Sequence, residues 1–184
     1  MKNSAHLMYI KGYQSTSIDD ILSSMQVTKG AFFYHFKNKE EMALALIKEL
    51  MYPGMKMMMV EPLDNSKDPI KDINKLMKTI LGDQVNFDVR YGCPMINLIE
   101  EMSPLSAGFN KALKMMTLTW VNAIADCLKR GQDNGQIKPD VNVIDAANYI
   151  VTAYAGARNM GKIFGTNSYQ SFLKQFAIYM DTLK

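Results

Sequence analysis

The segment TKGAFFYHFKNKEEM, from Thr28 to Met42, places basic side chains among aromatic ones. Between residues 27 and 39 the chain carries three lysines, one histidine and no acidic residue. Lysine and histidine donate hydrogen bonds to phosphate oxygens, and such contacts position a protein on a duplex. A nucleic-acid surface is one interpretation of the segment, and a solvated helix end attached to a piece of core is the other. Its aromatic residues are Phe32, Phe33, Tyr34 and Phe36.

Short helices separated by turns are expected to hold this segment. The spacing of apolar residues predicts a helix over residues 17–24. Thr28 can cap a second helix that ends near residue 34, and Asn38 can cap a third that runs until Pro53. Two short helices joined by a turn, the second with a polar and basic start, are the layout of a helix-turn-helix.

The second of these helices has the features that a major-groove contact requires. Its first turn offers Thr28, Lys29 and the backbone of Gly30, which has no Cβ and lets a phosphate approach closely. Phe32 and Phe36 are four residues apart, so they share one face and are expected to lie in the core.

The order and spacing of these residues closely resemble the DNA-binding domain of the TetR family of bacterial transcriptional regulators. The matching residues are Gly12-Tyr13, Thr16-Ser17-Ile18, Val27-Thr28-Lys29-Gly30, Phe32-Phe33-Tyr34-His35-Phe36 and Lys39-Glu40. The resemblance implies an all-α protein with a three-helix DNA-binding domain over residues 1–48. A helical ligand-binding and dimerisation domain would follow over residues 49–184.

The same resemblance implies which side chains meet operator DNA, and it places Val27 in the core. Phe33 stands where the family usually has tyrosine, and residues 1–48 contain no arginine for bidentate reading of guanine. At Met1 the family's first helix is already under way, so its usual basic arm is expected to be missing. The implied DNA contacts are Thr16, Ser17, Thr28, Lys29, Gly30, Ala31, Phe33, Tyr34, His35 and Lys39.

The rest of the chain is expected to be helical near residues 70–88, 93–103, 107–133, 144–164 and 168–183. By resemblance, the last two helices would pair with those of a second copy to form a homodimer. The small residues at 153–161 would permit close approach, and an aromatic stripe would supply apolar area; packing of the stripe inside one chain is the alternative. The stripe consists of Tyr169, Phe172, Phe176 and Tyr179.

A mainly apolar cavity for a small amphipathic or aromatic effector is expected in this second domain. Cys93 resembles the Gly-Cys pair that opens the sixth helix in one TetR subgroup, which raises oxidant or electrophile sensing as a hypothesis. Inert packing of a buried thiol is the alternative for Cys93, and Cys127 is expected in the core. The candidate lining residues are Phe87, Tyr91, Cys93, Asn97, Met115, Trp120, Tyr154 and Arg158.

Composition narrows the possible functions. The net charge is only +3 over 184 residues, too small for a DNA-architectural protein. No motif for a catalytic triad, a phosphate loop, a metal site or a cofactor is present, so we expect a regulator, with a helical ligand carrier or enzyme as the alternative. No apolar run is long enough to span a membrane and no secretory signal is evident, so a cytoplasmic location is expected.

Overall fold

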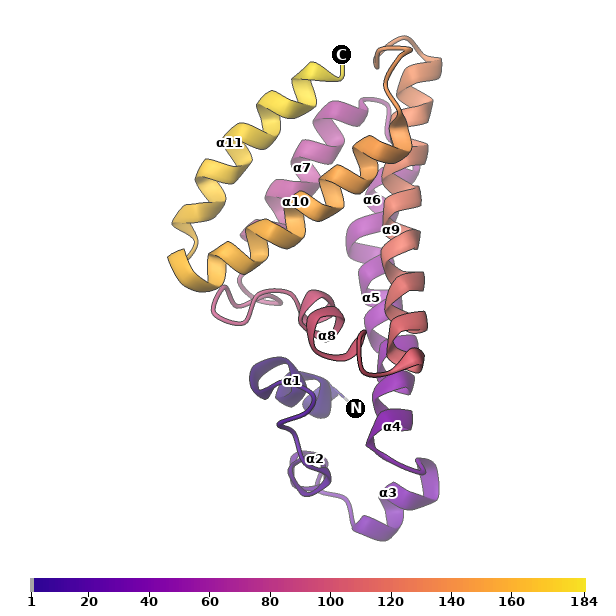
Figure 1. The fold of residues 1–184 in the computed structure, drawn as a ribbon, viewed down its shortest axis with the longest axis vertical. Coiled ribbons are helices and arrows are strands. Elements are labelled where there is room, and N and C mark those ends of the chain that lie inside the picture. The colour runs from indigo at the N-terminus through magenta and orange to yellow at the C-terminus, as the bar shows by residue number, and fades with distance from the viewer. Residues whose placement is uncertain (1) are drawn as a thin grey trace. The chain divides into compact units, whose positions relative to one another are not determined.

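The fold consists of helices, as the sequence predicts. The structure is a computed structural model that describes residues 2–184, and every regular element in that range is helical (Figure 1). The expectation about Met1 lies outside the described residues. The elements are α1 (Lys2–Lys11), α2 (Ile18–Met25), α3 (Lys29–His35), α4 (Lys39–Leu46), η1 (Ile47–Met51), α5 (Tyr52–Met55), η2 (Lys56–Val60), α6 (Glu61–Asp64), α7 (Pro69–Gly82), α8 (Pro94–Met102), α9 (Ala107–Asp133), α10 (Val143–Phe164) and α11 (Asn167–Thr182).

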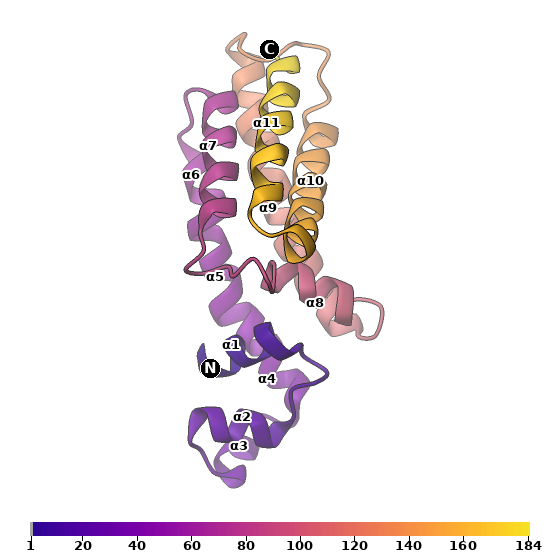
Figure 2. The same ribbon diagram turned by 90° about the vertical axis from the view of Figure 1, so that its left-hand side faces the viewer.

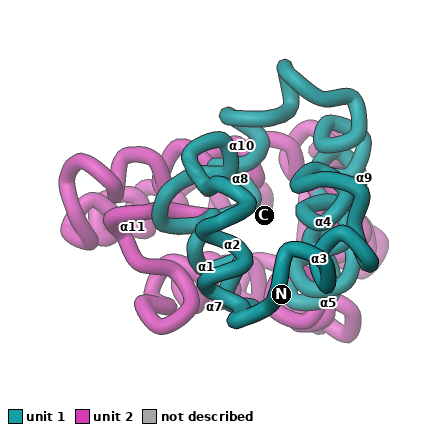
Figure 3. Tube along the Cα trace, turned by 90° about the horizontal axis from the view of Figure 1, so that it is seen from below, with its two compact units in different colours: residues 1–54, 94–116 teal, residues 55–93, 117–184 magenta. Residues whose placement is uncertain are grey.

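The chain forms two compact units that are not divided by a single cut (Figure 3). Unit 1 contains the described residues up to Gly54 together with Pro94–Met116, and unit 2 contains Met55–Cys93 and Thr117–Lys184. Helix α8 and the start of α9 therefore belong to the same unit as the predicted helix-turn-helix. Each unit contains two separate segments of the sequence, so the units do not correspond to the predicted domains on either side of residue 48. The domain boundary at residue 48 stays a prediction.

The core of unit 1 forms where the first four helices turn their apolar faces inward. Ile21, Phe32 and Met42 are at most 2% exposed, one from each of α2, α3 and α4. Side-chain caps fix the starts of these helices: Ser17, Thr28 and Asn38 each accept a hydrogen bond from the backbone N–H three residues later. Each cap satisfies one donor that the first helical turn leaves free.

The third predicted helix does not end at Pro53, contrary to expectation. The helical backbone continues from α4 through η1, α5, η2 and α6 to Asp64. Pro53 has no backbone N–H to donate, which normally interrupts a helix. Just before it, the backbone has π-helical hydrogen bonding, in which the Tyr52 N–H donates to the Ile47 carbonyl five residues back. The segment between Asp64 and the next helix is short, because Asp68 already caps α7.

Helix α7 also ends earlier than the expected residue 88. Its last residue is Gly82, and the Asp83 side chain then accepts hydrogen bonds from the backbone N–H groups of Val85 and Asn86. This Asx-type turn competes with a further helical turn and starts the loop that leads to Cys93. Burial, the largest single effect, acts to raise the pKa of Asp83. Hydrogen bonds donated by Asn86 and Val85, together with the charge of Arg158, outweigh burial, so the pKa is lowered.

Unit 2 is a bundle in which α11 packs on both α7 and α10 (Figure 2). The part of α9 that belongs to this unit contributes Trp120, Ile124 and Leu128, which have no exposed surface. Asn142 caps α10 by accepting from the N–H groups of Ile144 and Asp145. Gly165, with φ of +69°, ends α10 in a backbone conformation that glycine adopts without strain, and the chain reverses into α11.

Candidate functional site

Helices α2 and α3 form the predicted helix-turn-helix, and the turn between them has a defined geometry. Gln26 adopts the left-handed conformation with φ of +56°, and its N–H caps α2 by donating to the carbonyls of Leu22 and Ser23. At the other end of α2, Ser17 and Asp20 form a reciprocal capping box. Hydrogen bonds from the Ser17 backbone and hydroxyl, with a further contribution from Lys11, lower the pKa of Asp20 to about 2.

The outer face of α3 and its N-cap carry most of the predicted DNA contacts. Tyr34 is 84% exposed and Phe33 is 45% exposed, while Phe32 points inward and is only 2% exposed. The Phe32 and Phe33 rings meet edge to face at 5.2 Å, so the buried ring supports the exposed one. The exposed residues of this face, named the α3 surface here, are Thr28, Lys29, Gly30, Ala31, Phe33, Tyr34 and His35.

Two of the predicted contacts point inward in the structure. Thr16 has no exposed surface, and its hydroxyl donates to the Gly12 carbonyl at 2.7 Å. The Lys39 Nζ donates to the carbonyls of Tyr13 and Thr16 at 2.9 and 3.0 Å. Both side chains therefore hold the loop between α1 and α2, because unpaired carbonyls in that loop need donors. Ser17 is exposed, but its hydroxyl is engaged by Asp20.

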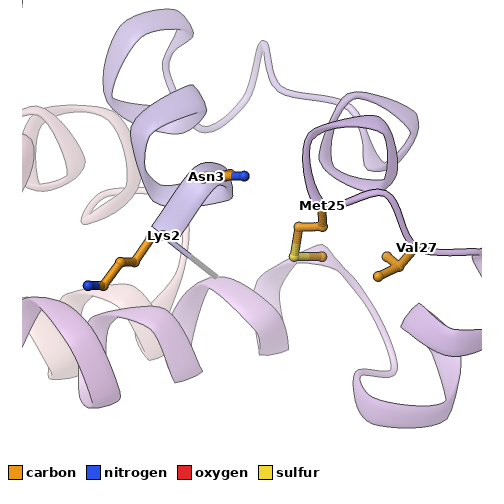
Figure 4. A pocket seen from close by; sticks show the side chains of 4 residues that line it. All are labelled: Lys2, Asn3, Met25 and Val27. Atoms are coloured by element: carbon orange, nitrogen blue, oxygen red, sulfur yellow. The ribbon is translucent and has the colours of Figure 1, made fainter.

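Val27 is not a core residue, contrary to the family-based expectation. Its side chain is 38% exposed, and it lines an open hollow of about 390 Å³ beside α1 and α2 (Figure 4). The hollow is completed by Lys2, Asn3 and Met25. Phe32 is the buried residue of α3, whereas Val27 lies at the edge of the core and Phe36 is half-buried.

The sequence did not predict the role of Glu101, which holds the same loop from helix α8. Its two carboxylate oxygens accept hydrogen bonds from the backbone N–H groups of Tyr13 and Gln14 at 2.9 and 2.7 Å. We call Glu101, Lys39 and the loop they bind the α1–α2 loop clamp. No local pattern signals this clamp, because Glu101 lies more than 80 residues from its partners.

Further contacts within unit 1 surround the clamp. The Ser106 hydroxyl donates to Glu40 at 2.5 Å, and the rings of Tyr13 and Phe109 meet edge to face at 4.8 Å. Burial lowers the pKa of Lys39, while the charge of Glu101 opposes this shift. Burial and the charges of Glu40 and Glu101 raise the pKa of Tyr13. The start of the helix-turn-helix is thus bound to residues of α8 and α9 by several polar and aromatic contacts.

Five of the eight predicted effector-lining residues belong to unit 2 and are buried there. Trp120, Tyr154 and Arg158 have no exposed surface, and Phe87 and Cys93 are 8% and 2% exposed. The Trp120 and Tyr154 rings meet edge to face at 5.1 Å.

Arg158 is bound into the same group. Its Nε donates to the Tyr154 hydroxyl at 3.0 Å, and an Nη donates to the Ile80 carbonyl. Its guanidinium also lies 4.7 Å from the Phe87 ring centre. The structure adds Tyr169, whose ring centre is 5.6 Å from the guanidinium. We call these residues the Arg158 cluster.

The electrostatics of the Arg158 cluster keep its groups in fixed protonation states. Burial, with a smaller effect from Cys93, raises the pKa of Tyr154 well above its ordinary value, so it is a neutral phenol at physiological pH. Burial lowers the pKa of Arg158, but Tyr154 and Tyr169 outweigh this and the net shift is upward. The cluster therefore contains one permanent positive charge.

The other three predicted lining residues are not members of the Arg158 cluster. Met115 is 47% exposed and belongs to unit 1, as does the half-buried Asn97. Tyr91 is half-buried and stacks with Arg90, whose guanidinium carbon is 5.2 Å from the ring centre. The spacing of apolar residues along a helix cannot distinguish these three positions from the buried ones, because it does not indicate which helix covers which face.

Cys93 and Cys127 are both free and buried. A reactive thiol needs access to solvent and a stabilised thiolate, whereas Cys93 is 2% exposed beside the neutral Tyr154. Burial raises the pKa of Cys127. These surroundings favour the packing role for Cys93, and sensing stays an untested hypothesis.

Helices α10 and α11 expose several large apolar side chains. Ile163 and Phe164 are 71% and 65% exposed. A hollow of about 460 Å³ lies beside them and is lined by small and apolar residues of both helices, including Gly156 and Phe172. The predicted aromatic stripe is only partly on this surface, because Tyr169 and Phe176 are at most 4% exposed and pack inside the chain. The exposed apolar residues of the two helices, named the α10–α11 face, are Ile144, Tyr149, Met160, Ile163, Phe164 and Ile178.

Two further features are absent from the described part of the chain. Among residues 2–184, no helix has the length and apolar character needed to cross a bilayer. In the same range, no group of three or more histidine, cysteine or acidic side chains is arranged to hold a metal ion.

Both the N-terminal and the C-terminal part of the chain match models of known protein families. Residues 1–46 match the model of bacterial regulatory proteins, tetR family, and residues 69–176 match the model of the tetracyclin repressor-like C-terminal domain. A similar curated protein is an HTH-type transcriptional regulator in the lacX 3′ region of Lactococcus lactis, 34% identical over 66% of this chain and 62% of its own length. The chain thus spans about six-tenths of that relative's length.

Two further comparisons agree with this result. The HTH-type transcriptional repressor DhaR of Mycobacterium sp. is 26% identical over 80% of this chain and 72% of its own. The crystal structure of regulatory protein TetR from Rhodobacter sphaeroides superimposes with a TM-score of 0.84 at 26% identity, covering 96% of this chain and 94% of that one. With its helix-turn-helix in one matched segment and its helical bundle in the other, the chain belongs to the TetR family of bacterial regulatory proteins.

Proposed function

We propose that the protein is a one-component transcriptional regulator, a repressor that binds a palindromic operator as a homodimer and is released by a small effector. The observation that carries the proposal is the α3 surface, where an exposed basic and aromatic face is supported by the buried Phe32. Repression rather than activation is supported by the name of the relative DhaR. Since the relatives are regulators, no catalytic step is proposed, and the site of action is the cytoplasm, where operator DNA is found.

The first turn of α3 supplies the contacts that best fit a major groove. Thr28 caps the helix with its hydroxyl, which leaves the exposed Lys29 and Gly30 at the leading end. Tyr34 and His35 are exposed at the other end and suit phosphate contacts. With no arginine in this segment, base recognition rests on shape, van der Waals contacts and hydrogen bonds from few groups.

The α10–α11 face is the proposed dimer interface. Groups of exposed large apolar side chains often mark interaction surfaces, and the small residues beside them permit helices to approach closely. A two-fold dimer would present two α3 surfaces to two half-sites about one DNA turn apart. Dimerisation is therefore part of operator recognition in this proposal.

Effector release requires that the effector bind two conformations with different affinity. The α1–α2 loop clamp is a suitable route for this coupling, since α8 follows directly after Cys93 in the chain and Glu101 binds the loop before α2. A movement of α8 would change the support of the helix-turn-helix. The effector is proposed to bind in the Arg158 cluster.

The test of this function is binding of the purified protein to the DNA upstream of its own gene. Fluorescence anisotropy should detect a complex with a palindrome in that region at modest salt, and a scrambled duplex of equal length should bind far more weakly. A protein that binds both duplexes equally, or neither of them, is not an operator-specific regulator.

Replacing Lys29 with methionine is expected to weaken operator binding and reduce its dependence on salt. A dimer would lose two phosphate neutralisations, so the slope of log K against log salt should become shallower by about 2. Lys75→Met, which removes an exposed lysine from α7, is the matched control and should leave the slope unchanged. Equal slopes for the Lys29 variant and wild type would place Lys29 outside the interface.

Replacing Gly30 with alanine is expected to change stability and binding in opposite directions. Outside the local helix backbone, the nearest described atom to a Cβ at Gly30 would be Thr28 Oγ1 at 4.0 Å, so the variant should be more stable by about 0.5–1 kcal/mol. Operator affinity should nevertheless fall about tenfold, because the added methyl group would meet the DNA backbone. Thermal unfolding and anisotropy on the same preparation measure both effects, and unchanged affinity would contradict the proposed close approach.

A further inference from the structure

Arg158 is a buried cation without a carboxylate partner. It has no exposed surface, and none of the ion pairs found among residues 2–184 includes it. Its hydrogen-bond acceptors are the neutral Tyr154 hydroxyl and the Ile80 carbonyl. Removing a charge from water costs several kcal/mol unless an opposite charge or several dipoles compensate it. Arg158 has only partial compensation of this kind.

Asp83, an acidic residue influenced by this charge, does not neutralise it. Arg158 contributes to lowering the pKa of Asp83, but it is the smallest of the contributions. The Asp83 carboxylate instead accepts hydrogen bonds from Val85 and Asn86. The positive charge therefore stays unpaired within the described residues of the cluster.

Two donors of the cluster are also unused. The Nη1 of Arg158 and the Nε1 of Trp120 are buried, and neither has a hydrogen-bond partner among residues 2–184. Both residues contact the Tyr154 ring, so the two donors belong to one group of packed side chains. Buried donors without acceptors are uncommon in folded proteins and point to an acceptor that is not part of the chain.

The remaining surface of the cluster is aromatic. The guanidinium lies 4.7 Å from the Phe87 ring centre, 5.4 Å from that of Tyr154 and 5.6 Å from that of Tyr169. Tyr169 helps to raise the pKa of Arg158, and its hydroxyl is a third buried polar group of the cluster without a hydrogen-bond partner among residues 2–184. These rings suit an apolar body attached to a charged group.

We infer that the effector is a small organic carboxylate, held by charge pairing with Arg158 and by its apolar body against the aromatic rings of the cluster. The inference rests on the proposed function and assigns a chemical class to its effector. One guanidinium balances one negative charge, and its planar donors match the two oxygens of a carboxylate. A phosphate dianion fits less well, because a single cation among aromatic rings would leave half its charge buried and uncompensated.

Trp120 provides a direct measurement, because it is the only tryptophan in the chain. The full-length protein would be titrated with acetate, butyrate, hexanoate and benzoate while Trp120 fluorescence is recorded. Each acid would be compared with its uncharged primary amide at constant ionic strength, with inorganic phosphate as the test of the other anion class. At least one acid is expected to bind below about 10 mM, and its amide at least tenfold more weakly.

Arg158→Met tests the residue itself. Binding of that acid should weaken at least tenfold, while thermal stability should be unchanged or higher, because the buried charge has no carboxylate partner to lose. Arg158→Lys keeps the charge but not the planar fork, so it should bind with intermediate affinity. Arg130→Met, which removes another arginine of unit 2, is the matched control and should bind the acid as wild type does.

The outcomes separate this inference from the proposed function. If no acid in the series alters Trp120 fluorescence, if acid and amide bind equally, or if phosphate alone binds, the inference is overturned while operator binding is unaffected. If Arg158→Met does not fold, Arg158→Lys provides the test. Its affinity for the acid must be lower than that of wild type but still measurable, and any other result contradicts the inference. If acids bind but operator DNA does not, the proposed function fails and the carboxylate site remains.

Discussion

Ile163→Asp is expected to convert the dimer to a monomer and to abolish measurable operator binding. Ile163 is 71% exposed in the single chain, so aspartate there should fold normally. In a dimer formed through the α10–α11 face, however, the carboxylate would be buried among apolar side chains at a cost of several kcal/mol. Loss of the dimer removes the second half-site contact, which should lower operator affinity by at least about a hundredfold.

Sedimentation equilibrium would measure the first effect, since the chain mass is 20.8 kDa and a dimer has twice that mass. Val85→Asp is the matched control: it places the same charge at an apolar residue that is 95% exposed and lies outside the α10–α11 face. That variant should remain dimeric and bind operator normally. A dimeric Ile163→Asp protein would show that the copies associate through another surface.

Glu101→Ala is expected to loosen the start of the helix-turn-helix. The backbone N–H groups of Tyr13 and Gln14 would lose a charged acceptor, and Lys39 would lose a nearby negative charge. Hydrogen bonds to charged groups contribute about 1.5–3 kcal/mol each, and partial exposure at Gln14 reduces the sum, so the expected loss of stability is about 2–3 kcal/mol. Operator affinity should fall with it, because α2 and α3 depend on this loop for their position.

Hydrogen exchange would locate the effect of Glu101→Ala. The amides of Tyr13 and Gln14 should exchange faster, while those of α10 and α11 should not change. Glu49→Gln, which removes an exposed carboxylate from η1, is the control and should alter neither exchange nor affinity. If operator affinity stays at the wild-type value in Glu101→Ala, the clamp has no part in DNA recognition.

Local sequence pattern was sufficient for the starts of the first helices and for the exposure pattern along α3. Capping residues such as Ser17, Thr28 and Asn38 mark helix starts through contacts with residues three positions away, and such contacts are visible in sequence. The alternation between the buried Phe32 and the exposed Phe33 and Tyr34 follows from helical geometry. Fold class was predictable for the same reason.

Contacts between distant segments were not predictable in this way. The residue type of Lys39 suits a phosphate contact, but its ammonium group donates hydrogen bonds to backbone carbonyls of the loop after α1 instead. Glu101 lies more than 80 residues from Tyr13 and Gln14, whose N–H groups it binds, so no local pattern indicates its role. In the effector region, the cluster around Arg158 was identified by residue type, whereas the exposure of Met115 depends on which helices cover α9.

The π-helical segments η1 and η2 have a consequence for insertions and deletions in this part of the chain. A π turn takes in one more residue than an α turn, so each segment holds a residue that α geometry would not need. Deleting one residue within Ile47–Met51 should restore α geometry in that segment. Leu63, which is buried in α6, would then keep its orientation and its packing. Deleting one residue from the regular helix α7 has no such remedy and would rotate every later side chain of that helix by about 100°. Length variation in the helix from Lys39 to Asp64 should therefore concentrate in its π segments.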